Sequence, residues 1–177
     1  VEDILKNAFN AELASGNATY SEGVYAVAMD PNTGAVLAMA GIRHDLETGE
    51  SSVDALGTMT NVFVPGSVVK AATLTSGWEN NAISGNQVLT DQPISFGGTD
   101  SITSWFTQYG SRAITAQEAL EYSSNTYMVQ VALKMMGTPY SADMKLDFDE
   151  LDSSMKKLRS TFAEYGLGTS TGIDLPN

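Results

Sequence analysis

Ser67 and Lys70 have the residue types and spacing that serine acyl transfer needs. Pro65 and Gly66 end whatever structure precedes them. An apolar run to Trp78 then predicts a buried helix that begins near Ser67. One helical turn would place the lysine amine on the same face as the serine hydroxyl. Burial and the positive end of a helix would lower the pKa of that amine, so that it could take the proton of the nucleophile.

The simpler alternative is that Ser67 caps a helix and Lys70 points to solvent. A serine three residues before a lysine is not a specific pattern, because Ser153 and Ser154 stand at the same spacing from lysines. Both lie within a predicted amphipathic helix over residues 151–165, away from its apolar stripe. We therefore expect Ser153, Ser154 and their lysines on a solvated face.

Composition narrows the classes of function. With 177 residues and 42% hydrophobic content, the chain can bury one sizeable core. A net charge of −12 argues against a nucleic-acid partner, and the absence of cysteine excludes disulfides and thiolate-bound zinc. The single histidine, His44, stands in a charged stretch and is expected in a loop. A Ser-His-Asp mechanism is therefore not favoured, which leaves lysine as the base. The sequence has no apolar run long enough to span a bilayer.

The N-terminal third predicts one helix and one β-hairpin. Residues 1–15 have apolar residues at four-residue spacing. Two apolar runs, 24–29 and 35–40, are joined by a turn sequence over 30–34. Neither run alternates with polar residues, so we expect both faces of these strands to be covered. No further strands that could pair with this hairpin are evident in the chain.

The rest of the chain is predicted to be mainly helical. We expect an exposed loop over 41–60 and a mostly irregular segment over 77–103. A capping-box sequence at 115–118 opens a short helix. The later elements are expected to be a helix over 127–136, an acidic loop over 143–150 and the amphipathic helix over 151–165.

Ser123-Ser124-Asn125 is the second candidate for chemistry. It interrupts two apolar helical segments, so its polar side chains are expected at a packed edge. A serine two residues before an asparagine also occurs at 15–17 and 84–86, but glycine in the middle position makes these typical turns. The alternative for 123–125 is a turn between helices with local caps.

Taken together, Pro65-Gly66-Ser67-x-x-Lys70 and Ser123-x-Asn125 resemble two motifs of the penicillin-binding proteins, the serine D,D-transpeptidases of bacterial wall synthesis. The resemblance is greatest to the class B, 2b-like members of Gram-positive cocci. Further similar stretches, in the family's order, are residues 27–40, 121–128, 166–168 and 171–176.

The resemblance implies an α+β fold, with an antiparallel sheet covered by helices and an all-helical subdomain. Residues 1–177 would form a partial, helix-rich transpeptidase domain. Residues 1–66 would hold the first helix, the hairpin and a loop, and residues 67–177 the mostly helical part. The family's third motif, Lys-Thr/Ser-Gly on a later strand, is absent from this sequence. We therefore expect only the N-terminal part of the domain here, inactive on its own.

The function implied by the resemblance is peptidoglycan D,D-transpeptidation. Ser67 would be the nucleophile, Lys70 the base, Ser123 a proton relay and Asn125 a substrate-binding residue. β-Lactams would acylate Ser67, and neither a metal nor an organic cofactor is implied. The partners would be stem peptides, β-lactams and, for the parent protein, other cell-wall synthesis proteins. The parent would be extracytoplasmic and anchored in the membrane by a segment outside this chain, which is itself expected to be soluble.

Two alternatives remain open at this stage. A serine β-lactamase or β-lactam sensor of the same superfamily would share the acylation step and differ in the rate of deacylation. A non-catalytic fragment or interaction module would need none of these roles.

Overall fold

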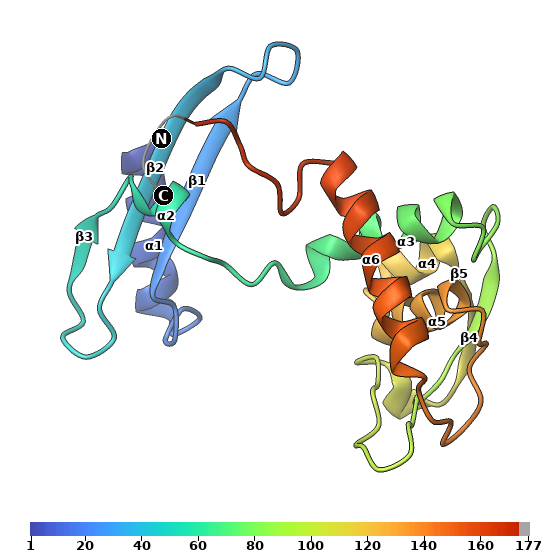
Figure 1. Cartoon of the computed structure of the whole chain (residues 1–177). Helices are drawn as coiled ribbons and strands as arrows, with labels where there is room; N and C mark the ends of the chain where they lie inside the picture. Colours follow the sequence, from blue (N-terminus) through green and yellow to red (C-terminus); the bar gives the residue numbers. More distant parts are fainter. Residues whose placement is uncertain (174–177) are drawn as a thin grey trace. The chain divides into compact units, whose positions relative to one another are not determined.

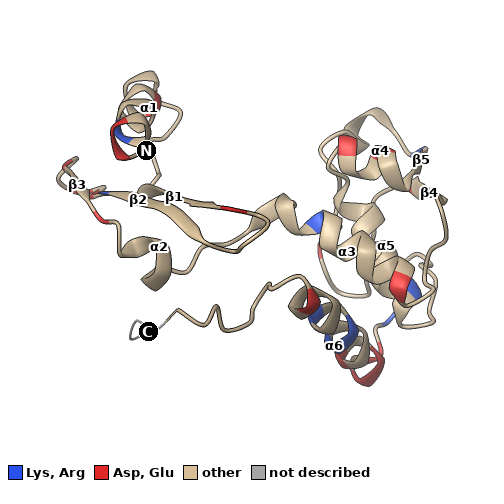
Figure 2. Cartoon of the chain, turned by 90° about the horizontal axis from the view of Figure 1, so that it is seen from above, with Lys and Arg blue, Asp and Glu red and all other residues tan. Residues whose placement is uncertain are grey.

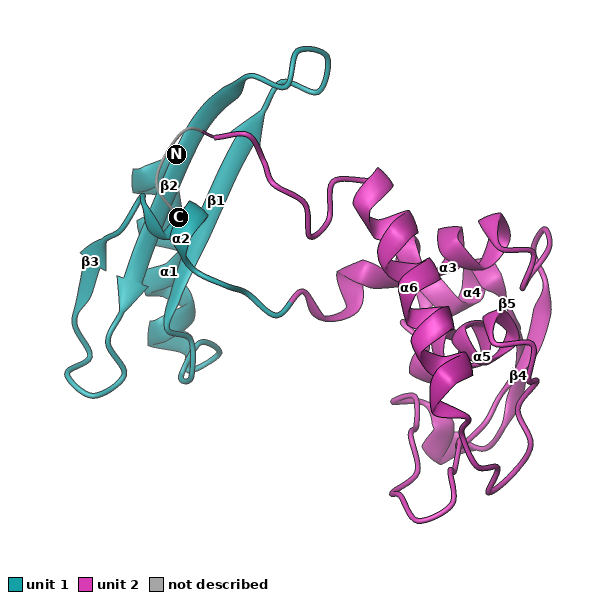
Figure 3. Cartoon of the chain, in the orientation of Figure 1, with its two compact units in different colours: residues 1–64, 175–177 teal, residues 65–174 magenta. Residues whose placement is uncertain are grey.

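The computed structural model describes residues 1–173, which fall into two compact units (Figure 3). We call residues 1–64 the hairpin unit and residues 65–173 the helical unit. The predicted boundary after residue 66 is a prediction about domain layout that remains to be tested. The last residues of the predicted 171–176 stretch lie outside the described part of the chain.

The hairpin unit is a small antiparallel sheet with two helices (Figure 1). Its strands follow the order β1-β2-β3, and Val27 of β1 pairs with Met39 of β2. The helix and the two strands predicted for this region are confirmed, but β3 lies in the stretch that was expected to be a loop. The bounds are α1 Glu2–Ser15, β1 Gly23–Met29, β2 Val36–His44, β3 Ser51–Val53 and α2 Gly57–Thr60.

Helix α1 packs against the sheet through Phe9, which is buried and meets the His44 ring edge-on at 5.8 Å. Gly16 ends the helix in the left-handed conformation that glycine adopts easily, at φ 81°. The prediction that His44 lies in a loop was wrong. It is the last residue of β2, and its Nδ1 lies 3.0 Å from Ser51 Oγ on β3.

The expectation that both faces of the hairpin are covered was also wrong. Ala40 and Ile42 are buried, but Met29 and Leu37, near the turn, are 55% and 69% exposed. The two helices of this unit lie near the other end of the hairpin, so the apolar strands extend beyond them (Figure 1). Lack of alternation in sequence therefore did not indicate cover by this unit's own helices.

The helical unit contains four α-helices of at least six residues, two short 3-10 helices and a two-stranded sheet. Strands β4 and β5 pair antiparallel, with Val88 opposite Thr115. β4 falls within 77–103, so the prediction of a mostly irregular segment missed it. The bounds are η1 Gly66–Val69, α3 Lys70–Glu79, β4 Val88–Asp91, η2 Thr107–Tyr109, β5 Arg112–Thr115, α4 Ala116–Glu121, α5 Asn125–Met135 and α6 Phe148–Glu164.

The core of the helical unit lies where α3 packs on α5 and α6. Leu74 of α3, Tyr127 and Val131 of α5 are fully buried there. Gly77 permits the close approach of α3 to α5, because a Cβ at this position would meet Val131 Cγ1 at 2.6 Å. This packing holds the N-termini of α3 and α5 in place, and both predicted motifs lie at those termini.

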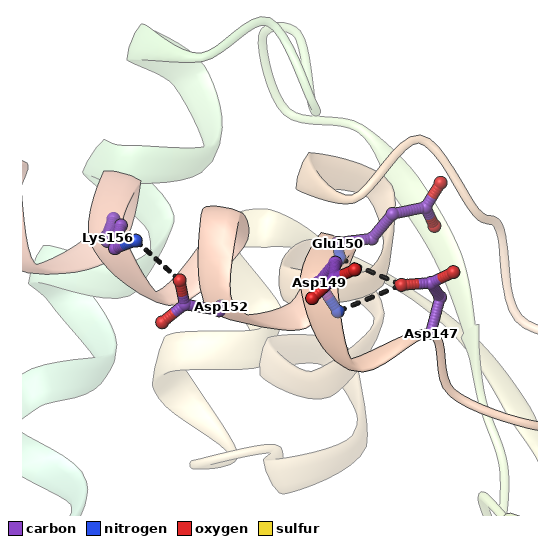
Figure 4. Close-up of polar contacts among 5 residues, drawn as sticks. All are labelled: Asp147, Asp149, Glu150, Asp152 and Lys156. Atoms are coloured by element: carbon purple, nitrogen blue, oxygen red, sulfur yellow. Dashed lines mark hydrogen bonds and ion pairs between the residues drawn. The ribbon is translucent and has the colours of Figure 1, made fainter.

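Helix α6 begins at Phe148, three residues before its predicted start. Asp147 caps it by accepting hydrogen bonds from the backbone N–H groups of Asp149 and Glu150, at 2.9 and 3.1 Å (Figure 4). Acidic side chains gather at this end of the helix (Figure 2). Because negative charge is favourable at a helix N-terminus, the acidic sequence starts the helix rather than preceding it.

The expectation of a solvated face at 153–157 was only partly right. Lys156 is exposed and pairs with Asp152 one turn earlier (Figure 4). Ser154, however, is fully buried and donates to the carbonyl of Ala132 on α5 at 3.0 Å. Lys157 Nζ donates to the carbonyl of Met135, also on α5, at 3.2 Å. A polar residue thus faces α5 here because it satisfies backbone carbonyls near the end of that helix.

Candidate active site

Ser67 lies in the 3-10 turn η1, directly before α3. Gly66 precedes it with φ at 59°, a conformation that most residues avoid, so the Pro65-Gly66 entry sets the direction in which the turn starts. Ser67 is exposed, whereas Lys70, one turn further on, is only 8% exposed. The predicted helix start is therefore present, as a tight turn leading into an α-helix.

Lys70 Nζ is held by Ser123. It donates to the Ser123 carbonyl at 2.6 Å and to Ser123 Oγ at 2.8 Å. Burial lowers the pKa of the Lys70 amine from its ordinary value, because removal from water disfavours the charged form. The sequence argument also invoked the positive end of the helix, but desolvation is the cause that the structure identifies.

Ser123 connects the two residues of the first motif. Its Oγ lies 3.0 Å from Ser67 Oγ, although 56 positions separate the two serines in the chain. Within residues 1–173, no hydrogen bond joins Ser67 Oγ to Lys70 Nζ directly. The three side chains therefore form a chain of contacts, with the Ser123 hydroxyl in the middle.

The break between α4 and α5 presents Ser123. Thr115 and Glu118 form the predicted capping box at the start of α4. Ser123 then adopts φ 53°, which is uncommon for a residue other than glycine. Ser124 caps α5 by accepting from the backbone N–H of Tyr127 at 3.0 Å. The triplet is thus a junction between helices with a local cap, and it also brings Ser123 to Lys70.

Asn125 is the exposed first residue of α5. Its Nδ2 donates to the carbonyl of Thr103 at 3.1 Å, so a separate loop fixes the direction of its amide. The structure brings Ser67, Lys70 and Ser123 together through side-chain hydrogen bonds. Asn125 lies beside them through the backbone.

Sequence reasoning missed a group of buried polar residues behind this cluster. Asp91, Ser104 and Ser124 are each no more than 2% exposed and are joined by hydrogen bonds. They lie in β4, in the loop before η2 and at the N-cap of α5. No spacing in the sequence could indicate them, because they are far apart along the chain and meet only in the fold.

Two further searches of residues 1–173 bear on function. They contain no group of three or more histidine, cysteine, aspartate or glutamate side chains that could hold a metal ion. Among the helices described for these residues, none is long and apolar enough to cross a membrane.

Comparison with known proteins defines the class. The model of the penicillin-binding protein transpeptidase domain matches residues 24–177, so the chain belongs to that family. It is 66% identical over its whole length to penicillin-binding protein 2B of Streptococcus pneumoniae serotype 2 strain D39. It is 36% identical, again over its whole length, to penicillin-binding protein 2A of Bacillus subtilis strain 168.

The solved structures agree. Penicillin-binding protein 2B from S. pneumoniae strain R6 superimposes with a TM-score of 0.92 at 66% identity, covering 99% of this chain and 29% of that one. The corresponding structure from strain 5204 also gives 0.92, at 63% identity. The predicted family and the mixed helical and antiparallel-sheet fold are therefore confirmed. The chain spans about a quarter of the curated relatives, 26% of the pneumococcal protein and 24% of the B. subtilis one.

Proposed function

We propose that this chain is part of a peptidoglycan D,D-transpeptidase in which Ser67 is the acylated nucleophile. The observation that carries the proposal is the contact chain from Ser67 Oγ through Ser123 Oγ to the buried Lys70 Nζ. Membership of the penicillin-binding protein family supports it from an independent direction.

The contact chain offers a route for the nucleophile's proton. With the amine neutral, hydroxyl protons can rotate so that Ser67 donates to Ser123 and Ser123 donates to Lys70. As Ser67 Oγ attacks, its proton passes to Ser123, and the Ser123 proton passes to Lys70 Nζ. The result is an ammonium and an alkoxide already bonding to the substrate carbonyl. The lowered pKa of Lys70 makes the neutral amine accessible at lower pH.

The acylation step then follows. Ser67 Oγ bonds to the carbonyl carbon between the two D-alanines of a stem peptide, and the bond to the terminal D-alanine nitrogen breaks. Ser123, adjacent to both serine and lysine, returns a proton to that leaving amine. Asn125 would bind the peptide backbone, since its amide both donates and accepts. The amine of a second stem peptide attacks the ester, forms the cross-link and releases Ser67.

β-Lactams would acylate the same serine, because their strained amide presents an equivalent carbonyl. For the full-length protein we also propose extracytoplasmic placement, a membrane anchor outside this chain and partners among the cell-wall synthesis proteins. A β-lactamase or sensor of the same superfamily would share acylation, and the rate of deacylation separates it from a transpeptidase.

Labelling with a fluorescent penicillin tests the proposal in the full-length protein that contains this chain. Ser67→Ala should abolish covalent labelling. The matched control is Ser153→Ala, because Ser153 has the same spacing to a lysine but is exposed on α6. Normal labelling of Ser67→Ala would overturn the assignment of the nucleophile. Release of the label within seconds to minutes would instead indicate a β-lactamase.

A further inference from the structure

Asp91 is a fully buried acidic residue that the acylation chemistry does not use. It ends strand β4 and accepts hydrogen bonds from three hydroxyls. Ser104 Oγ and Ser124 Oγ both donate to its Oδ2, the former at 2.9 Å, and Thr107 Oγ1 reaches its Oδ1 at 3.4 Å. Within residues 1–173 it forms no ion pair. A buried carboxyl group supported only by hydroxyls is costly, so its retention calls for a reason.

The hydroxyls around Asp91 connect it to the start of α5. Because Ser124 and Ser104 direct their protons to the carboxyl group, their oxygen lone pairs are available to accept. Ser124 Oγ accepts from the backbone N–H of Tyr127 at 3.0 Å. Ser104 Oγ accepts from the backbone N–H of Asn125 at 3.1 Å. The carboxyl group therefore caps the helix through two intermediaries, at the end where negative charge is favourable.

The two intermediaries adjoin both parts of the second motif. Ser124 directly follows Ser123, whose unusual φ of 53° needs support from its surroundings. Ser104 directly follows Thr103, whose carbonyl accepts from the Asn125 side chain at 3.1 Å. One buried residue thus fixes the backbone beside Ser123 and also the loop that orients Asn125.

We propose that Asp91 is a positioning residue that holds Ser123 and Asn125 in register with Ser67 and Lys70. It acts through Ser124 and Ser104 and touches neither substrate nor Ser67. The proposal rests on the proposed acyl transfer at Ser67. It assigns to Asp91 the geometry of the relay, because Lys70 is anchored on the carbonyl and hydroxyl of Ser123.

Asp91→Asn in the full-length protein tests this assignment. Asparagine has the same shape, but its NH₂ group donates, so one side can no longer accept from a hydroxyl. We expect the first-order rate constant of benzylpenicillin acylation to fall on the order of tenfold to a hundredfold, because small displacements of reacting groups have effects of this size. The dissociation constant of the non-covalent complex should change much less.

The pH profile provides a readout that lost stability alone would not move. Loosening Ser123 lets water reach Lys70, which raises the pKa of its amine toward the ordinary value. The pH at which acylation reaches half its maximum should therefore rise in Asp91→Asn. Ser154→Ala is the matched control, because Ser154 is also fully buried in the helical unit but bonds to the Ala132 carbonyl. It should leave both the acylation rate and its pH midpoint unchanged.

A second variant keeps the test decisive if Asp91→Asn does not fold. Ser104→Ala removes the connection to Asn125 and leaves the Ser124 cap, so it should weaken the non-covalent complex more than it slows acylation. A folded Asp91→Asn with normal acylation rate and pH midpoint would overturn the proposal, as would Ser104→Ala with normal binding. Ser67→Ala, run in parallel, separates the two claims. If it still acylates, the proposed function has failed, whatever Asp91 does.

Discussion

The two units of this chain treat their hydrophobic residues differently. Every member of the main buried cluster, from Leu74 of α3 to Leu158 of α6, belongs to the helical unit. The hairpin unit buries Phe9, Ala40 and Ile42, yet leaves large apolar side chains such as Met29 and Leu37 exposed. The helical unit therefore has a core of its own, whereas the sheet of the hairpin unit, with three strands, is small for an independent fold.

The difference bears on where the candidate chemistry lies. Ser67, Lys70, Ser123 and Asn125 all belong to the helical unit, and the buried polar group around Asp91 is part of the same packing. A site that depends on hydroxyl contacts near 3 Å benefits from elements that pack tightly, because displaced groups lose these contacts quickly. The better-packed unit is therefore the one that carries the cluster.

A pair of leucine truncations would test this contrast with the largest expected effect. Leu74→Ala should lower the free energy of unfolding of the chain by about 2–5 kcal/mol, because Leu74 is fully buried in the core. Leu37→Ala, which removes the same atoms from an exposed strand position, should change it by no more than about 0.5 kcal/mol. Urea denaturation followed by circular dichroism measures both. Equal losses would show that the hairpin face is covered in solution.

Ser123 offers a sharper and smaller test within the helical unit. Because its φ is positive, Ser123→Gly should be more stable than Ser123→Ala by about 1 kcal/mol. At Ser153, in the middle of α6, the order should reverse by a similar amount, since glycine disfavours a helix interior by about 1 kcal/mol. Thermal unfolding of the four variants gives the comparison. The same order at both positions would contradict a strained backbone at Ser123.

The smallest effect concerns pH and stability. The pKa of Lys70 is lower in the folded chain than in the unfolded chain, so the unfolded state binds more protons between the two values. This contribution to stability is fully present above the ordinary lysine pKa of about 10.4 and is lost as pH falls through the folded pKa. Lys70→Met should flatten that part of the stability profile.

Lys156→Met is the control for this measurement, because Lys156 is exposed on α6 and lies outside the core. Its stability profile should keep the slope of the unaltered chain below pH 10.4, to about the precision of urea midpoints. A slope unchanged in Lys70→Met would mean that the buried amine is hydrated in solution.

Local patterns in the sequence predicted the elements whose hydrogen bonds are local. The capping box at Thr115, the hairpin turn over 30–34 and the glycine end of α1 at Gly16 all correspond to structure. Elements stabilised by distant partners were missed. Strands β3 and β4 are short and polar in part, and pairing with β2 and β5 makes them strands.

The candidate site shows the same division. Spacing placed Ser67 and Lys70 on one turn, but spacing alone could not distinguish them from the serines of α6. Their contact with Ser123 depends on the packing of α3 against α5, which no local pattern encodes. Asp91 could not be selected at all, because its three hydroxyl partners are 13, 16 and 33 positions away. The resemblance to a family joined the two motifs, and the fold supplied the buried residues behind them.

The central claim is that Ser67 is the residue that becomes acylated, and peptide mapping after reaction with benzylpenicillin tests it most directly. The full-length protein is acylated, digested and analysed by mass spectrometry. The account predicts one adduct, on the peptide that contains Ser67, and its loss in Lys70→Met, where no amine can accept the proton. An adduct on the peptide with Ser123 and Ser124, or on the one with Ser153 and Ser154, would contradict it.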